Sequence, residues 1–356
     1  MAPYFSFLRG VLGTLSKDLG IDLGTSFTRI LSPEKGVLVH EPSAVAINIR
    51  TQQLLAVGRD AEDMMGKNPP HISVHHPLQK GVISDFESTE KMLKVFIDQA
   101  HRELASLMPR PRVVIGVPLE TTEVERKAIE DAVFSAGARQ VNLVENPILC
   151  AIGANMDISE SSGILVVDTG GGKTEIAVIS LAGVVAWKSL PIAGDELNKN
   201  IVQYARDCFN LLIGERHAEH VKREIGSVLE THENPSMAMR GRDLLSGLPK
   251  EIRVNERQIH EAIQRSIAMI IENVKSTLEV TPPELVADIY ERGIVLTGGG
   301  SLLRGLAALL SSEAQIPVRV AEDPILCAVQ GAGTLLGNAL LLKDITLPSS
   351  SDTRMR

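Results

Sequence analysis

Residues 164–174 read Ile-Leu-Val-Val-Asp-Thr-Gly-Gly-Gly-Lys-Thr, and residues 19–28 read Leu-Gly-Ile-Asp-Leu-Gly-Thr-Ser-Phe-Thr. In both stretches a short apolar run leads to an aspartate, and a glycine follows two positions later. A strand that ends in a glycine turn and is followed by a second strand explains each pattern. The recurrence of Asp-x-Gly at Asp22 and Asp168, in matching surroundings, predicts two similar halves.

Strand-like and helix-like segments alternate along the rest of the chain, which indicates an α/β fold. Apolar runs predict strands over residues 19–22, 113–117, 140–144, 164–168, 175–180, 184–189, 293–296 and 318–320. Helical periodicity predicts helices over residues 121–136, 147–154, 198–212, 218–227, 258–278 and 328–342, and one that runs from the glycines at 298–300 to Leu310. Thr121 or Thr122 is the expected cap of the first helix.

The composition limits the class of protein. A chain of 356 residues with 44% hydrophobic and 22% charged residues suits two globular domains of moderate size. Its net charge of −8 argues against nucleic-acid binding led by bulk electrostatics. The isolated Cys150, Cys208 and Cys327 argue against a disulfide scaffold and a thiolate zinc site, and they fit a reducing compartment. We expect no bilayer-spanning helix, because no run of 18 apolar residues occurs.

The two Asp-x-Gly turns have the chemistry of phosphate-binding loops. Glycine lets a backbone approach an anion closely, and the N–H groups of a turn can point at it. The first turn adds the hydroxyl groups of Thr25, Ser26 and Thr28. We expect Asp22 and Asp168 to hold the water ligands of a magnesium ion, because Mg²⁺ keeps several waters when one or two carboxylates bind it. The alternative is that each aspartate only caps a strand end.

A third glycine turn, residues 297–300, lies between a predicted strand and a helix and could admit a base and ribose. Residues 170–174 resemble part of a P-loop, but the first glycine of that motif is missing. Neither Asp-x-Gly turn leads directly into a helix, so a Rossmann fold is also disfavoured.

The three glycine motifs, GIDLGTSFT, VVDTGGGKTEIAVIS and GIVLTGGGSLLRGL, resemble the phosphate-1, phosphate-2 and adenosine motifs of the actin/Hsp70/sugar-kinase superfamily. EPSAVAI, PLQKGVISDFESTEKML, RVVIGVP and GRDLLSGLP resemble MreB, the family of rod-shape-determining bacterial actins. This resemblance runs from about Leu19 to Leu342. It implies an α/β actin-like ATPase fold with two RNase-H-like domains and a nucleotide cleft between them.

The resemblance also implies how the chain is divided. We expect domain I at 18–152, with an insertion at about 44–86, and domain II at 153–329, with an insertion at about 195–255. A membrane-binding segment at 1–17 is expected to precede domain I. A helix at 330–345 is expected to pack back on domain I and to be followed by a flexible tail at 346–356.

By the same resemblance, ATP or ADP and Mg²⁺ are the expected cofactors, and Asp22 and Asp168 are the metal-holding residues. The expected nucleotide-binding residues are Gly24, Thr25, Ser26, Gly170, Gly171, Gly172, Lys173, Glu219, Lys222, Gly298, Gly299 and Gly300.

Three positions depart from the MreB pattern. The family usually has Glu-Glu-Pro where this chain has Glu145-Asn146-Pro147, threonine in place of Lys173, and asparagine in place of Phe27. Glu145, Asn146 and Lys173 occupy the catalytic positions. The loss of groups that orient the attacking water predicts slow ATP hydrolysis. Asparagine can still orient water, and Lys173 could place a cation near the γ-phosphate or point to solvent.

Two segments are candidates for contact with a membrane. A stripe at helical spacing contains Tyr4, Phe5, Leu8, Val11, Leu12 and Leu15. It predicts either a helix that lies on a membrane surface or one docked on the protein's own core. Leu107 and Met108 resemble an apolar membrane-touching loop of MreB, and the alternative is an apolar cap at a helix end.

The resemblance implies a cytoplasmic filament protein on the inner face of the cytoplasmic membrane that helps to organise wall synthesis. The implied partners are further copies of the chain, MreC-, MreD- and RodZ-type proteins, wall-synthesis enzymes and another MreB paralogue, but no nucleic acid. The main alternative is a non-polymerising or co-polymerising regulator of another MreB. A small-molecule kinase of the same fold lacks a clear catalytic carboxylate, and an Hsp70-like chaperone lacks the expected peptide-binding domain after residue 350.

Overall fold

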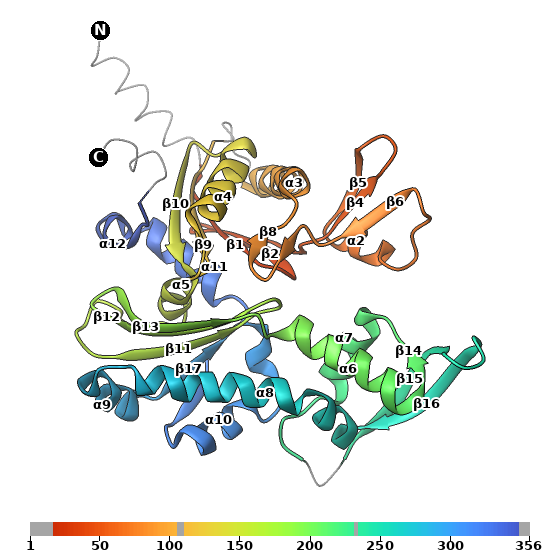
Figure 1. The fold of residues 1–356 in the computed structure, drawn as a ribbon. Helices are drawn as coiled ribbons and strands as arrows, with labels where there is room; N and C mark the ends of the chain where they lie inside the picture. Colours follow the sequence, from red (N-terminus) through yellow and green to blue (C-terminus); the bar gives the residue numbers. More distant parts are fainter. Residues whose placement is uncertain (1–16, 105–109, 231–233, 349–356) are drawn as a thin grey trace. The chain divides into compact units, whose positions relative to one another are not determined.

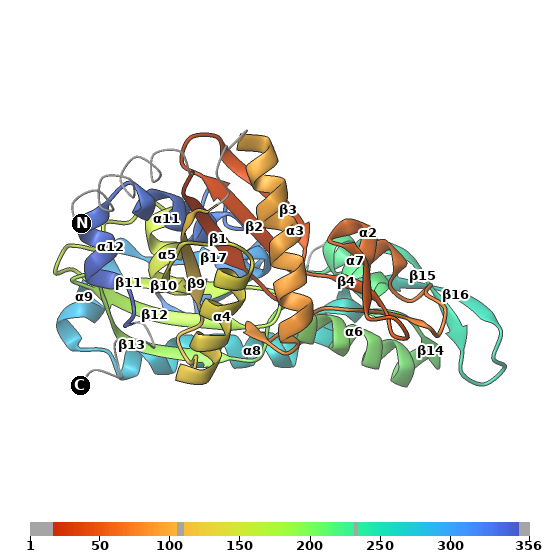
Figure 2. The same ribbon diagram turned by 90° about the horizontal axis from the view of Figure 1, so that it is seen from above.

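The computed structural model describes residues 17–104, 110–230 and 234–348, which form two compact units (Figures 1 and 2). The first unit contains the chain up to Asp157 and again from Leu326, and the second contains Ile158–Ile325. The boundaries expected at 152/153 and 329/330 lie a few residues away, inside helices α5 (Asn146–Gly153) and α11 (Cys327–Leu336).

The first unit is built on a five-stranded sheet of order β10-β9-β1-β2-β3. The central strand β1 pairs in parallel with β9, which pairs in parallel with β10, whereas β1-β2 and β2-β3 are antiparallel. These strands are β1 (Leu19–Leu23), β2 (Phe27–Ser32), β3 (Gly36–Pro42), β9 (Arg112–Val117) and β10 (Gln140–Glu145).

Helices cover both faces of this sheet (Figure 1). Leu19 and Ile21 share a buried apolar cluster with Phe96 of α3 (Phe86–Leu104) and with residues of α4 (Glu123–Ser135). The opposite face of the sheet meets α11, which also packs on α5. A Cβ added at Gly331 would lie 2.0 Å from the carbonyl oxygen of Leu149 in α5. The small residues of α11 therefore allow the two helices to pack closely.

The second unit repeats this arrangement in a sheet of order β13-β12-β11-β17-β18. Its central strand β11 pairs antiparallel with β12, which pairs antiparallel with β13. On its other side β11 pairs in parallel with β17, which pairs in parallel with β18, so the pairing pattern around β1 is repeated. The strands are β11 (Ile164–Thr169), β12 (Thr174–Ser180), β13 (Gly183–Leu190), β17 (Ile294–Thr297) and β18 (Val318–Val320). The prediction of two similar halves is confirmed.

Helices α8 (Glu256–Glu279), α9 (Pro283–Arg292) and α10 (Leu306–Ala314) pack against the strands of the second sheet. Their apolar faces join the strands in one buried cluster that includes Val167 and Ile267. The long α8 begins with a capping box between Asn255 and Gln258, which fixes its start.

Each unit carries a smaller subdomain. In the first unit it is a three-stranded sheet with one helix, followed by a short hairpin, and its elements are β4 (Val45–Asn48), β5 (Gln53–Val57), α2 (Arg59–Met64), β6 (Ile72–His75), β7 (Leu78–Gln79) and β8 (Val82–Ile83). In the second unit two helices accompany another three-stranded sheet, and its elements are α6 (Gly194–Phe209), β14 (Leu211–Leu212), α7 (Glu215–Ile225), β15 (Ser236–Asp243) and β16 (Pro249–Asn255).

All eight predicted strands are present, and each end lies within one residue of the prediction. Thr121 and Thr122 were the two expected caps of α4, and the structure shows that Thr122 caps it through a capping box with Glu125. The strands between residues 36 and 83 were not predicted, because most of them have five residues or fewer.

Several helix boundaries differ from the prediction. The helix expected over 198–212 ends at Phe209, because Asn210 adopts a left-handed conformation with φ 53°. The helix expected over 218–227 begins at Glu215 and ends at Ile225. The prediction of one helix over 328–342 is wrong. Helix α11 ends at Leu336, and Asn338 caps a separate helix, α12 (Ala339–Ile345). The glycine turn at 298–300 leads into a short 3₁₀ helix (Gly299–Leu302) and only then into α10.

Candidate functional site

The predicted site residues of the first unit lie at one edge of its sheet. Because β1, β9 and β10 are parallel, their carboxyl ends meet there, which is where open α/β sheets bind ligands. Asp22 lies next to the end of β1. Glu145 ends β10 opposite Val117 of β9, and Asn146 begins α5 directly after it. The sheet thus brings together Asp22, Glu145 and Asn146.

The loop from Gly24 to Ser26 joins β1 and β2 and is held by other parts of the same unit. The Gly24 N–H donates to the Phe27 carbonyl oxygen at 3.1 Å, and a Cβ at Gly24 would lie 2.8 Å from that oxygen. The Ser43 hydroxyl donates to the Gly24 carbonyl oxygen at 2.7 Å, and the Gly81 N–H donates to Thr25 Oγ1 at 2.8 Å. The loop is therefore preorganised before any ligand arrives.

Asp22 has a cationic neighbour that the sequence analysis did not single out. Arg29 faces Asp22 across the β1-β2 pair, and its Nη1 donates to Asp22 Oδ2 at 2.7 Å. An arginine placed opposite an aspartate by the antiparallel register is the signal that could have identified this pair.

Glu145 and Asn146 occupy distinct environments. Burial raises the pKa of Glu145, and the nearby Arg126 only partly opposes that effect. The side chain of Asn146 lies against Gly116 of β9, where a Cβ would be 2.0 Å from Asn146 Oδ1. Gly116 therefore provides the space that Asn146 occupies.

In the second unit, the phosphate-2 and adenosine motifs meet. The turn after β11 is closed by the Gly170 N–H, which donates to the Lys173 carbonyl oxygen at 2.9 Å. Asp168 pairs with Thr297 across the parallel β11-β17 ladder, and the Thr297 hydroxyl donates to Asp168 Oδ1 at 2.9 Å. A Cβ at Gly298, whose φ is +77°, would lie only 2.3 Å from the Thr169 carbonyl oxygen. The glycine at 298 is therefore required for this close approach.

Glu219 and Lys222 on α7 belong to the same network. Gly194, at the start of α6, donates its N–H to the Gly170 carbonyl oxygen at 3.2 Å, and its own carbonyl oxygen accepts from Lys222 Nζ at 2.9 Å. Lys222 pairs with Glu219 at 2.6 Å, and the Asn198 amide donates to Glu219 at 2.9 Å. Burial alone would raise the pKa of Glu219, but Lys222 and the Asn198 amide outweigh it and lower that pKa.

A magnesium ion held through water fits the Asp168 carboxylate, whereas the Asp22 carboxylate is already paired with Arg29. Among the described residues, no group of three or more His, Cys, Asp or Glu side chains could hold a metal ion by itself. Asp22 and Asp168 each provide a carboxylate beside a glycine loop. One or two carboxylates, several waters and phosphate oxygens form the usual magnesium site of nucleotide-binding proteins.

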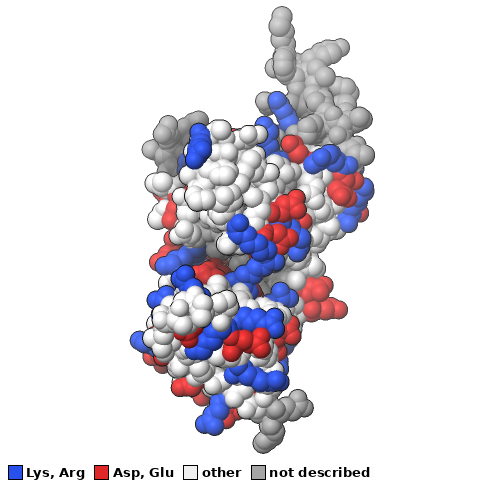
Figure 3. All heavy atoms as spheres, turned by 90° about the vertical axis from the view of Figure 1, so that its right-hand side faces the viewer, with Lys and Arg blue, Asp and Glu red and all other residues white. Residues whose placement is uncertain are grey.

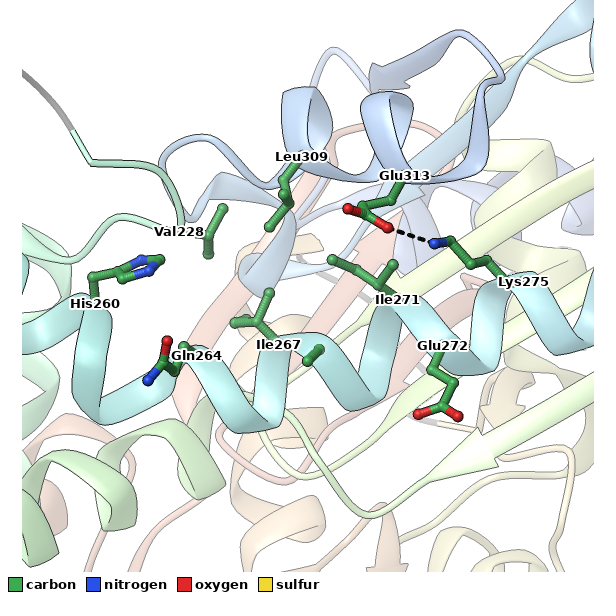
Figure 4. A pocket seen from close by; sticks show the side chains of 10 residues that line it. Val228, His260, Gln264, Ile267, Ile271, Glu272, Lys275, Leu309 and Glu313 are labelled. Atoms are coloured by element: carbon green, nitrogen blue, oxygen red, sulfur yellow. Dashed lines mark hydrogen bonds and ion pairs between the residues drawn. The ribbon is translucent and has the colours of Figure 1, made fainter.

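A separate cavity of about 380 Å³ lies between α8 and α10 of the second unit (Figure 4). Ile267, Ile271 and Leu309 form its apolar part, and the ion pair between Lys275 and Glu313 lies at one end. None of the predicted nucleotide-site residues lines this cavity.

The surface drawn in Figure 3 carries basic and acidic side chains close to one another. In the parts of the chain that the structure describes, no helix is both long enough and apolar enough to cross a bilayer. The predicted membrane-contact residues all lie outside the described residues, and they are Tyr4, Phe5, Leu8, Val11, Leu12, Leu15, Leu107 and Met108.

The repeated sheet topology and the glycine loops at the carboxyl edges define an actin-like ATPase fold. The model of the MreB/Mbl protein family matches residues 16–344, and the chain belongs to this family.

Curated relatives match almost the whole chain. The cell shape-determining protein Mbl of Bacillus subtilis (strain 168) is 45% identical over 323 residues, which cover 91% of this chain and 96% of Mbl. The cell shape-determining protein MreB of Escherichia coli (strain K12) is 46% identical over 333 residues, which cover 92% and 96%.

Solved structures agree with this assignment. MreB5 of Spiroplasma citri bound to AMPPNP has a TM-score of 0.86 and 34% identity, and the match covers 93% of this chain and 98% of MreB5. A MamK double helical filament has a TM-score of 0.75 at 23% identity over 91% of this chain and 99% of MamK, which supports the fold.

The glycine triplet provides a test with an internal control. Gly298→Ala should destabilise the second unit by about 1–3 kcal/mol or more, because the φ of +77° is strained for alanine and the added methyl overlaps Thr169. Gly299→Ala should be tolerated, since a Cβ there would be 3.7 Å from its nearest neighbour, a methyl of Ile325. Thermal unfolding of both variants measures the difference, and equal melting temperatures would contradict the packing described for Gly298.

The raised pKa of Glu145 predicts a pH-dependent gain from Glu145→Gln. Above the folded pKa, folding must bury part of an ionised carboxylate, so the neutral variant should be more stable at pH 7. This advantage should disappear as the pH falls below the ordinary value of 4.5, where the carboxyl is protonated in both states. Denaturant unfolding at pH 7 and pH 4, with the exposed Glu103→Gln as control, measures it. An advantage that is unchanged at pH 4 would count against burial as the cause.

Proposed function

We propose that this chain is a nucleotide-dependent actin-like filament protein that associates with the inner face of the cytoplasmic membrane and helps to determine cell shape by organising wall synthesis. The observation that carries the proposal is the pair of glycine loops, each next to an aspartate at the carboxyl edge of its sheet. Membership of the MreB/Mbl family supports the same conclusion.

ATP and ADP are the proposed nucleotides, and solved structures of the relative MreB5 are bound to AMPPNP and ADP. In this proposal the loops at 24–26 and 170–172 bind phosphates through backbone N–H groups and the hydroxyls of Thr25 and Ser26. The turn at 298–300 would approach the base and ribose, and Glu219 and Lys222 on α7 are joined to the Gly170 turn through Gly194. Magnesium, held through water by Asp168, would neutralise phosphate charge.

Hydrolysis of ATP is proposed to be slow. Phosphoryl transfer depends on positioning of the attacking water and on charge stabilisation. Asn146 is neutral, so it orients water more weakly than the glutamate usual in the family. Lys173 carries a positive charge and no hydroxyl to hold that water. Both substitutions therefore favour a bound triphosphate over rapid turnover.

Membrane attachment is proposed to depend on filament formation. An apolar side chain contributes at most about 1.5–3 kcal/mol when fully buried, and an interfacial helix gains only part of this. One segment at residues 1–17 would therefore bind weakly. A filament presents many copies at once, so that avidity makes the attachment firm.

The departures at Asn146 and Lys173 favour one alternative, a regulator that co-polymerises with another MreB or caps it without forming filaments alone. Filament formation by the purified chain distinguishes the two functions.

The filament proposal predicts polymers of the full chain with ATP, seen by negative-stain electron microscopy, that co-sediment with anionic liposomes. Deletion of residues 2–15 should leave the polymers intact but remove most of the lipid-bound fraction, because the apolar stripe is lost. Deletion of residues 350–356 is the matched control. No polymers with any nucleotide would favour the regulator, and unchanged co-sedimentation of the first variant would contradict the membrane role of the segment.

The turnover proposal predicts that the double variant Asn146→Glu, Lys173→Thr releases phosphate about tenfold faster or more, because well-placed water-orienting groups are restored. Lys199→Thr, on the exposed surface of α6, controls for the loss of a positive charge. Phosphate release from polymerised protein is the measurement. A rate equal to that of the unaltered chain would show that these two positions do not limit hydrolysis.

A further inference from the structure

Three strands of the first unit place a row of side chains beside the first glycine loop. Asp22 of β1 faces Arg29 of β2, and Arg29 in turn faces His40 of β3. Phe27 lies two positions before Arg29 and therefore on the same face of the sheet. The position of Phe27 is one of the three that depart from the MreB pattern, so the row contains a feature particular to this chain.

The contacts within this row are specific. Arg29 donates to Asp22 at 2.7 Å, and the guanidinium carbon lies 5.5 Å from the centroid of the Phe27 ring. Phe27 meets the His40 ring edge to face, with 5.2 Å between the centroids and 84° between the planes. The aromatic ring thus covers the guanidinium group and helps to fix its orientation toward Asp22.

Arg29 and Asp22 are largely withdrawn from solvent. Their side chains are only 12% and 16% exposed, so bulk water screens their attraction weakly. Charge-assisted hydrogen bonds of this kind are about twice as strong as neutral ones. Burial and the nearby Arg29 and Arg59 lower the pKa of His40, which is therefore neutral at pH 7. Glu41 points elsewhere, since its carboxylate accepts from the Arg59 N–H at 2.9 Å.

We infer that Arg29 neutralises Asp22 in place of a divalent cation, so that the first glycine loop binds a nucleoside polyphosphate with little dependence on magnesium. The inference rests on the proposed nucleotide binding. An unpaired carboxylate beside the loop repels phosphate, and a bound cation normally relieves this repulsion. Here a guanidinium group already does so, and it also opposes the approach of Mg²⁺ to Asp22. Phe27 is a positioning residue that acts through Arg29.

The test compares the dissociation constant of a fluorescent ATP analogue in excess EDTA and in excess Mg²⁺, measured on the full chain. For the unaltered protein we expect the two constants to agree within about threefold. Arg29→Met keeps the bulk of the side chain and removes its charge. In this variant we expect the dissociation constant in EDTA to exceed that in Mg²⁺ by about tenfold or more, which corresponds to one close charge interaction. Arg29→Lys should restore most of the magnesium-independent binding.

Arg112→Met is the matched control. Arg112 pairs with Asp18 at 2.7 Å at the other end of the same sheet, so this variant also removes an arginine from an ion pair. We expect Arg112→Met to have the same ratio of the dissociation constant in EDTA to that in Mg²⁺ as the unaltered protein. If Arg29→Met does not fold, as judged by circular dichroism, Phe27→Leu provides the second test and should raise the ratio about threefold through a less well oriented Arg29.

Two results would overturn the inference while leaving nucleotide binding intact. One is a loss of affinity of tenfold or more when magnesium is withdrawn from the unaltered protein, and the other is the same ratio in Arg29→Met as in the unaltered protein. An absence of binding in both buffers would overturn the proposed nucleotide function as well, so the two failures are distinguishable.

Discussion

Within each unit, the candidate site depends on close approach between backbone segments at the carboxyl edge of the sheet. In the second unit, the turn at Gly298 lies so near the Thr169 carbonyl oxygen that a side chain at 298 cannot fit. In the first unit, a Cβ at Gly24 would lie 2.8 Å from the Phe27 carbonyl oxygen. In each unit, parallel strands bring the glycine loop to the carboxyl edge of that unit's sheet, and the absence of a Cβ lets its peptide groups line that edge. Without these glycines, the loops beside the carboxylates of Asp22 and Asp168 could not adopt these tight turns.

The same principle explains how α11 belongs to the first unit although it follows the whole of the second. Because Gly331 and Gly153 have no side chains, α11 and α5 can come into close contact. A Cβ at Gly153 would lie 1.9 Å from the Cys327 carbonyl oxygen. Close helix packing here is enthalpically favourable because many atoms come into contact. Close packing of α11, whose own sequence contains no charged residue, therefore attaches this part of the chain to the first unit.

The sequence was most informative where local chemistry decides the structure. The strands around Asp22 and Asp168 were located within one residue, because apolar runs bounded by glycine leave few alternatives. Helix ends were less accurate, since the break before Asn338 depends on a single capping side chain. The antiparallel strands of the small subdomains carry polar residues that hide the apolar alternation.

The glycine loops of the site were likewise evident from sequence, whereas the residues that hold them were not. Ser43 acts on Gly24 from the connection between β3 and β4, and Gly194 joins the Gly170 turn to Lys222. These contacts arise only when distant segments fold together, so no local pattern indicates them. The Asp22–Arg29 pair is intermediate, because it follows from a register that a tight turn between two predicted strands defines.

The unusual residues of this chain change local charge in the same direction. Asn146 removes a negative charge that the family pattern places there, and Lys173 adds a positive one. Arg29 cancels the charge of Asp22 within the first unit. Under the proposed function, each change favours binding of an anion to its own unit and is less suited to activating water. In the proposed function, tight retention of a nucleotide and weak turnover have one electrostatic origin, and Phe27 contributes by orienting the guanidinium of Arg29.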